Sequence, residues 1–224
     1  MNKSINVLLV FLAIPTMVLC IFVGMNLPIE FLKTSGAQLP FRFEIFLTIG
    51  ILFFVIILRR STKRWMGVKM VSQTEKYKWN EAMSSERKNR VYLYQSLESA
   101  LMLFAAISFY TVCKDAWLPA TAVMFGTIDN LLFLFMGKFK NIYRVGLTSK
   151  AIVVADRDVI VLYYTGLRKV TMHQQTIFFD YIKDLQISFP INCIDEKNRT
   201  NFKNNLEAQL DRDKVFFSDD VKAL

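Results

Sequence analysis

Four apolar stretches of the length needed to cross a bilayer constrain this chain more than any other feature. They lie roughly at 5–25, 40–60, 93–113 and 117–137, and the most apolar part of the second is 43–58. A hydrocarbon core about 30 Å thick requires roughly 20 helical residues. The sequence therefore predicts a polytopic membrane protein with four transmembrane helices in residues 1–137.

The first stretch has an alternative interpretation, because Lys3 precedes it as a basic residue precedes the apolar core of a cleaved signal sequence. The stretch is long for such a core and contains no small-x-small cleavage site. We therefore expect residues 5–25 to be retained as the first span.

The charge of the chain is concentrated in the segment 59–92. This loop contains ten Lys and Arg residues and three Glu residues, so it supplies +7 of the net charge of +9. Short loops rich in Lys and Arg remain on the cytoplasmic side of a membrane. We expect this loop and both termini to be cytoplasmic.

The basic loop has three interpretations. It can serve only to orient the spans, it can contact anionic lipid, or it can contact nucleic acid. The last is disfavoured because its charges alternate in sign over 77–90. The predicted lipid contacts are Arg59, Arg60, Lys63, Arg64 and Lys69. Since residues 73–90 are rich in helix-forming residues, the loop is expected to be helical, with Trp65 and Trp79 near the headgroups.

The tail, residues 138–224, changes from helical to alternating periodicity, which is typical of strands. Strands are predicted at 142–147, 151–155, 159–165, 168–173, 176–182 and 185–191. A C-terminal helix is predicted at about 195–212. Its apolar stripe, formed by Phe202, Leu206 and Leu210, would face either the core or a partner. The predicted fold class is a transmembrane α-helical domain followed by a small cytoplasmic α+β domain.

Two segments of the tail carry a resemblance to a known class. They are GLTSKAIVVADRDVIVLYYTGLRKV and LQISFPINCIDEKNRTNFKNNLEAQL. This pattern over about 70 residues resembles bacterial four-span inner-membrane proteins with a small cytoplasmic pleckstrin-homology-like (PH-like) domain. The resemblance implies an antiparallel barrel closed by one helix, a role in recognition or scaffolding, and location in a bacterial inner membrane. A generic antiparallel sheet with a helix packed on it is the alternative.

Two acidic residues, Glu98 and Asp129, lie inside predicted spans, and Asn130 accompanies them. An ionisable group in the bilayer costs at least about 2.5–3.5 kcal/mol, so it requires a partner or a purpose. Three hypotheses follow. Both acids can form a proton- or cation-responsive site, or both can line the seam of an oligomer. In the structural alternative, Glu98 extends to the interface and meets a Lys or Arg of the basic loop, while Asp129 hydrogen-bonds between packed helices. Ala122 and Gly126 form a small-xxx-small pair that indicates helix association.

The sequence contains no recognisable catalytic motif. It lacks a glycine-rich phosphate loop, a nucleophile elbow and a zinc-protease motif. Its three cysteines, Cys20, Cys113 and Cys193, and its one histidine, His173, do not have zinc-site spacing. We expect no metal, no cofactor and no enzymatic activity.

The function predicted from these patterns is a membrane anchor or sensor subunit. It would form a homo-oligomer in the membrane and hold a cytoplasmic protein partner through its tail and basic loop, in a multicomponent system such as antiphage defence. The alternative is a small oligomeric transporter or channel for protons or cations that uses Glu98 and Asp129.

Overall fold

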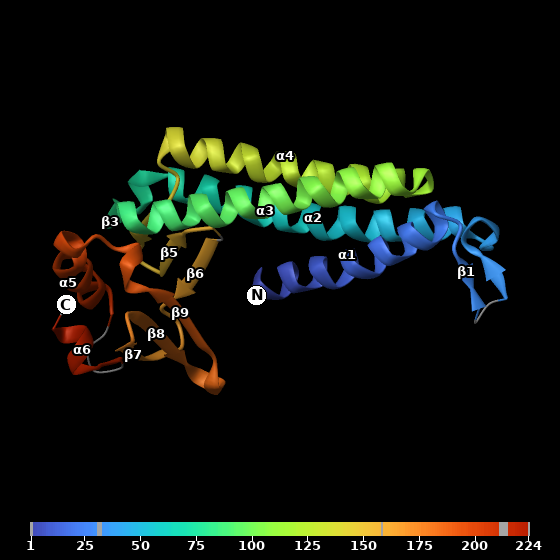
Figure 1. Ribbon diagram of the computed structural model, residues 1–224. Coiled ribbons are helices and arrows are strands. Elements are labelled where there is room, and N and C mark those ends of the chain that lie inside the picture. Colours follow the sequence, from blue (N-terminus) through green and yellow to red (C-terminus); the bar gives the residue numbers. More distant parts are fainter. Residues whose placement is uncertain (1, 31–32, 158, 211–214, 224) are drawn as a thin grey trace. The chain divides into compact units, whose positions relative to one another are not determined.

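The structure is a computed structural model that describes residues 2–30, 33–157, 159–210 and 215–223 (Figure 1). The chain divides into two compact units. The helical unit comprises Met1–Lys63 and Tyr94–Phe135, and the sheet unit comprises Arg64–Leu93 and Met136–Leu224. Each unit is described by itself.

Helices dominate the first 140 residues. The α-helices are α1 (Asn2–Gly24), α2 (Arg42–Ser72), α3 (Ser85–Val112), α4 (Trp117–Lys140), α5 (Arg199–Gln209) and α6 (Asp219–Lys222). Short 3₁₀ turns are η2 (Gly36–Gln38), η3 (Thr74–Lys76), η4 (Lys114–Ala116), η5 (Ile182–Asp184), η6 (Ile191–Cys193) and η7 (Glu196–Asn198).

Three segments are long and apolar enough to cross a membrane: Val7–Gly24, Ser85–Val112 and Lys114–Lys140. They correspond to the first, third and fourth predicted spans. The second predicted span lies in α2, which is 31 residues long but is not among these three. Within α2, 14 uncharged residues separate Glu44 from Arg59.

The helical unit has one apolar core to which all four of its helices contribute. Phe53 of α2 and Phe109 of α3 are almost fully buried, and their ring centroids are 6.1 Å apart. Val23 of α1 and Val123 of α4 belong to the same core. Outside the core, α1 is followed by a hairpin of two short strands, β1 (Pro28–Ile29) and β2 (Thr34–Ser35), each of two residues.

The sheet unit contains two four-stranded sheets. One has the order β3-β4-β5-β6 and is antiparallel throughout; the other has the order β10-β7-β8-β9. The strands are β3 (Trp79–Ala82), β4 (Arg144–Leu147), β5 (Ala151–Ala155), β6 (Val159–Tyr163), β7 (Leu167–His173), β8 (Thr176–Tyr181), β9 (Gln186–Pro190) and β10 (Phe216–Phe217). All six predicted strands are present, with ends within two residues of those expected.

The strand β3 was not predicted. Residues 73–90 were expected to be helical, and this was wrong for 79–82, which pair with β4 in the register Trp79↔Leu147 to Ala82↔Arg144. The helical prediction used only local composition, whereas strand formation here depends on pairing with residues more than 60 positions away. The sheet unit therefore includes part of the basic loop in addition to the chain that follows α4.

The end of α2 packs against the first sheet. Val71 shares a small apolar cluster with Val153 and Ala155 of β5. Gly67 allows this approach, because a Cβ at that position would collide with the Val159 side chain. All five residues of β5 are buried, so both faces of the strand are covered.

The helix α5 closes the domain through Phe202. Its ring lies 5.4 Å from Trp79 of β3 and 6.3 Å from Phe189 of β9, measured between centroids. Trp79 therefore packs against α5 within the sheet unit. The stripe faces the core of the sheet unit and not a partner, because all three of its residues, Phe202, Leu206 and Leu210, are buried. Residues 211 and 212 of the predicted helix lie outside the described residues.

The buried stripe of α5 makes a stability prediction. Phe202→Ala should lower the free energy of unfolding by about 3–5 kcal/mol, because it removes a fully buried ring and leaves a cavity. Denaturant unfolding of the full chain in detergent, followed by tryptophan fluorescence, measures the change. Asn204→Ala, at an exposed position of the same helix, is the matched control and should have little effect. Equal effects of the two substitutions would contradict this packing.

Candidate functional site: a buried polar layer between three helices

Most of the buried polar residues in the described part of the helical unit gather where α2, α3 and α4 meet. They are Arg60 and Ser61 of α2, Gln95 and Ser99 of α3, and Thr127 and Asn130 of α4. Glu98 and Asp129 are partly buried beside them. We call these eight residues the polar layer. Since buried polar groups are costly unless they are hydrogen-bonded, such a concentration requires a network of partners.

The centre of the polar layer is an ion pair between Arg60 and Glu98. Their side chains are 8% and 20% exposed, and the guanidinium contacts Glu98 Oε1 directly. Asn130 completes a triangle, because Arg60 Nη2 donates to its Oδ1 at 3.4 Å and its Nδ2 donates to Glu98 Oε1 at 3.3 Å. One residue from each of three helices is thus joined in a single network.

Asp129 is held by a different residue of α2. Ser61 Oγ donates a hydrogen bond to Asp129 Oδ1 at 2.7 Å. Glu98 therefore contacts Arg60, and Asp129 contacts Ser61. Because Ser61 directly follows Arg60, both acids are bound to the same turn of α2. Hydroxyls elsewhere in the layer bond back to their own helices: Ser99 Oγ to the Gln95 carbonyl and Thr127 Oγ1 to the Val123 carbonyl.

This geometry favours one of the three hypotheses for the acids. Glu98 meets an arginine from the end of the second apolar stretch, and Asp129 hydrogen-bonds between packed helices, as the structural hypothesis requires. The Arg60 charge offsets that of Glu98 inside the layer. The contacts between these helices explain why two acids are retained within apolar segments.

Ala122 and Gly126 bring helices of the same chain together. Both are buried, and a Cβ on Gly126 would meet Met102 Cε at 2.6 Å and Ile57 Cδ1 at 3.1 Å. The small residues of α4 thus let α2 and α3 approach it closely. The pair therefore serves helix contact within one chain.

The five residues predicted to contact anionic lipid divide into two groups. Arg59 and Lys69 are exposed and Lys63 is partly exposed. Arg60 and Arg64 are 7% and 3% exposed, so they lie inside the protein and not on a headgroup-facing surface. The amino-acid sequence does not distinguish the two groups, because all five residues carry the same charge and lie in the same segment.

A second polar cluster lies in the sheet unit, at the start of α3. Ser84 caps this helix, since its Oγ accepts a hydrogen bond from the Arg87 backbone N–H at 3.1 Å, and it also donates to the Asn192 carbonyl at 2.5 Å. Arg87 pairs with Asp156, which follows β5, and its Nε donates to Asp156 Oδ2 at 3.0 Å. The first turn of α3 is therefore tied to two distant segments of the domain.

Cys193 lies beside this cluster and is fully buried. Burial raises the pKa of its thiol from 9.0 to about 12, and the Asp156 charge acts in the same direction, while Arg87 lowers the pKa. The thiol is therefore protonated at neutral pH. Thiolate is the reactive form of cysteine, so Cys193 is a packing residue and not a nucleophile.

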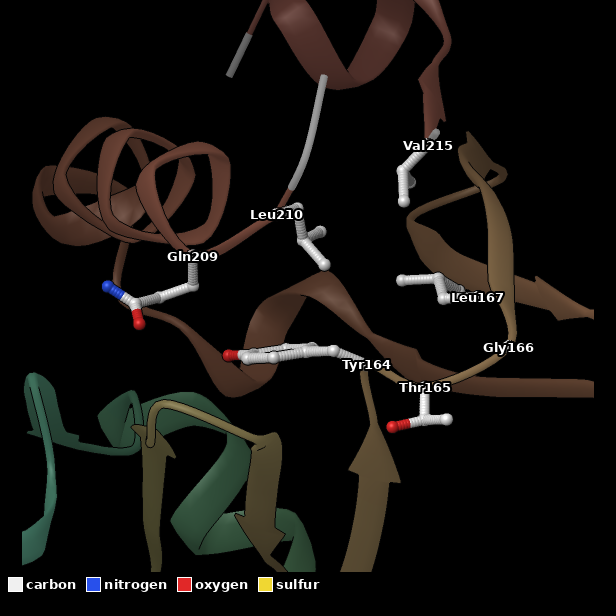
Figure 2. Close-up of a pocket in the computed structure, with 7 residues that line it drawn as sticks. All are labelled: Tyr164, Thr165, Gly166, Leu167, Gln209, Leu210 and Val215. Carbon is white, nitrogen blue, oxygen red and sulfur yellow. The ribbon is translucent and has the colours of Figure 1, made fainter. Parts of the chain in front are cut away.

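A cavity in the sheet unit has a volume of about 350 Å³. Figure 2 shows Leu167, Leu210 and Val215 pointing into it, above the ring of Tyr164. Thr165, Gly166 and Gln209 complete its lining. None of these seven residues is an acid, a base or a metal ligand of the usual kind, and residues 211–214, which join Leu210 to Val215, lie outside the described residues.

No group of three or more His, Cys, Asp or Glu side chains suited to a metal ion occurs among the described residues. Cys20, Cys113 and Cys193 are free thiols. Comparisons of the chain with protein families, with curated proteins and with solved structures found no match. The resemblance to inner-membrane proteins with a PH-like domain therefore stays a prediction.

The ion pair of the polar layer makes a second stability prediction. Glu98→Gln should lower the free energy of unfolding by about 3–5 kcal/mol, because it leaves the Arg60 charge buried without its counter-ion. The double variant Arg60→Met with Glu98→Met should recover most of this loss, since it removes both charges. Unfolding in detergent micelles measures each variant.

The matched control is Glu86→Gln on the same helix. Glu86 pairs with Arg90, but both side chains are more than half exposed, so the expected change is about 0–1 kcal/mol. A loss in Glu98→Gln no larger than that in Glu86→Gln would contradict the buried pair.

The raised pKa of Cys193 makes a prediction about alkaline pH. In the unfolded chain the thiol ionises near its ordinary pKa of 9.0, whereas in the fold it keeps its proton to about 12. Stability contributed by the neutral thiol is therefore complete below pH 9 and decreases as pH rises towards 12. The difference in unfolding free energy between the natural chain and Cys193→Ala should change by about 1.4 kcal/mol per pH unit in this window. A difference that does not vary with pH would show that the thiol is not buried.

Proposed function

We propose that this protein is a four-span anchor or sensor subunit of a bacterial inner membrane that holds a cytoplasmic protein partner and does not catalyse a reaction. The observation that carries the proposal is the composition of the sheet unit. It is built from the segment between α2 and α3 together with the chain that follows α4. A domain assembled in this way is attached to three helices and suits a role that links a membrane domain to a soluble partner.

The proposal of four spans rests on α2. Three other helices are long and apolar enough to cross a membrane. α2 shares the core of the helical unit with them through Phe46, Phe53 and Ile57. It also exposes Ile51, Val55 and Leu58, which are about half accessible and would contact lipid chains. A helix with an apolar inner face and an apolar outer face belongs in the same environment as its neighbours.

The proposed orientation places both termini and the sheet unit in the cytoplasm. It rests on the excess of seven positive charges in 59–92, supported by Lys138 and Lys140 at the end of α4. Arg59, Lys63 and Lys69 are accessible to anionic lipid in this arrangement. The hairpin of β1 and β2 then lies outside.

The polar layer would hold the three helices in one register. Removing either member of the Arg60–Glu98 pair would leave a buried charge, so α2, α3 and α4 should separate or slide only at high cost. A sensor of membrane state would act through this layer. Association into a homo-oligomer is part of the proposal, and its interface must lie elsewhere than at Ala122 and Gly126.

The second candidate function is transport of protons or cations. It is favoured by the partial exposure of Glu98 and Asp129, which leaves both acids within reach of the surface of the helical unit. Against it, both acids already have protein partners, and a pathway would require several copies of the chain. The two functions differ in which residues they need.

The test is purification of the tagged full-length protein from its native host in a gentle detergent, with mass spectrometry and a native mass measurement. The anchor function predicts a stoichiometric soluble protein that is retained by Asn204→Ala and lost from Phe202→Ala. Glu98→Gln combined with Asp129→Asn should reduce partner binding only to the extent that it unfolds the protein.

A protein that purifies without a soluble partner would contradict the anchor function. If ion flux in vesicles were then abolished by Glu98→Gln with Asp129→Asn and unaffected by Phe202→Ala, the transport function would replace it. The native mass gives the copy number in either case.

A further inference from the structure

Two of the three cysteines lie in the same core of the helical unit. Cys20 is in α1 and is 0% exposed, and Cys113 directly follows α3 and is 3% exposed. Both belong to the cluster that includes Phe46 and Phe109. In the structure both are free thiols.

The backbones of α1 and α3 approach each other closely beside these cysteines. A Cβ on Gly24 would collide with the carbonyl oxygen of Val112, so only glycine permits this contact. Cys20 lies four residues before Gly24, which places it on the same face of α1, and Cys113 is the residue after Val112.

Both cysteines lie near one end of the apolar segments. Cys113 separates the segments Ser85–Val112 and Lys114–Lys140, and Cys20 lies four residues before the end of Val7–Gly24, or about 6 Å along the helix. The inference that these ends face the outer, oxidising side rests on the orientation given under the proposed function. Disulfides form and persist in that compartment, whereas Cys193 would be in the reducing cytoplasm.

We propose that Cys20 and Cys113 form a disulfide in the native membrane. The oxidant is the disulfide of an extracytoplasmic dithiol–disulfide oxidoreductase, and the reaction accompanies packing of α1, when Cys113 is still accessible. The Cys113 thiolate attacks one sulfur of that disulfide and releases the other as a thiolate. The Cys20 thiolate then attacks the Cys113 sulfur and displaces the oxidoreductase, which leaves as a dithiol. Two electrons and two protons pass from the cysteine pair to the oxidant.

The disulfide would connect two helices that are distant in the sequence. It would close a loop containing the hairpin, α2, β3 and the whole of α3, and it would fix α1 to the end of α3. Once packed, the bond would be shielded from reductants, because both sulfurs are buried. This gives α1 a covalent attachment in addition to its apolar contacts.

The test counts free thiols in the full chain. Cells are quenched with acid, and the protein is denatured in detergent and labelled with a polyethylene-glycol maleimide, with and without prior reduction. The proposal predicts one label before reduction, on Cys193, and three after it. Cys20→Ala and Cys113→Ala should each show two labels before reduction, because each frees the other cysteine. Cys193→Ala should show none before reduction and two after it.

Three labels before reduction of the natural chain would overturn the proposal. Two further measurements then assign the cause. Diamide treatment of the purified protein tests whether the two thiols can join at all. An impermeant maleimide applied to Gln38→Cys, in a chain lacking the other cysteines, tests whether the exposed turn η2 is outside. If diamide does not join the two thiols, the proposed pairing is incorrect. If the impermeant maleimide does not label Gln38→Cys, the proposed orientation is incorrect.

Discussion

The pairing of β3 with β4 is the interaction on which the sheet unit depends. Four residues of a basic loop form an antiparallel ladder with the first strand after α4. The ladder covers an edge of β4 that would otherwise be open, and it brings Trp79 against Phe202 of α5. Since β3 lies between α2 and α3, its place in the sheet restrains the ends of both helices. The loop is therefore a structural part of the domain in addition to carrying charge.

The polar layer imposes a different kind of constraint on the helical unit. Apolar packing tolerates small shifts of one helix along another, whereas an ion pair and its hydrogen bonds have one good geometry. Arg60, Glu98 and Asn130 come from three helices and satisfy one another. The gain in stability from such a pair is small, because both groups lose hydration when they are buried. The ion pair instead restricts how the helices can pack, because any arrangement that separates Arg60 from Glu98 leaves a buried charge without its partner.

Much of the architecture is predictable because its signals are local. The six strands of the tail and the stripe of α5 follow from alternation and from four-residue spacing of apolar residues. The need of Glu98, Asp129 and Asn130 for partners is predictable, because they are polar residues within apolar segments. The strand β3 has no such signal, since its four residues do not alternate between apolar and polar and its partner strand is distant in the sequence. The start of α3 was marked by Ser84, a preferred N-cap residue, which indicates that the chain before it is not helical.

The partners within the polar layer were not predictable from composition. Arg59, Arg60, Lys63 and Arg64 form a basic run at the end of the apolar stretch, and nothing local distinguishes the two that are buried. Only the rotation of α2 against α3 and α4 determines that Arg60 meets Glu98. For the same reason Ala122 and Gly126 correctly indicated helix contact, but the sequence did not reveal that the contact is within one chain.

The segment between α2 and α3 is part of the folded domain. Hydrogen exchange of the full-length protein in lipid nanodiscs, read on a peptide that covers 78–83, tests this most directly. The amide hydrogen of Met83, which donates to the Tyr143 carbonyl, and that of Glu81, two residues earlier in the same ladder, should exchange slowly, comparably with those of β5. Phe202→Ala should accelerate both regions together. Exchange over 79–82 as fast as in an unstructured loop would contradict the account.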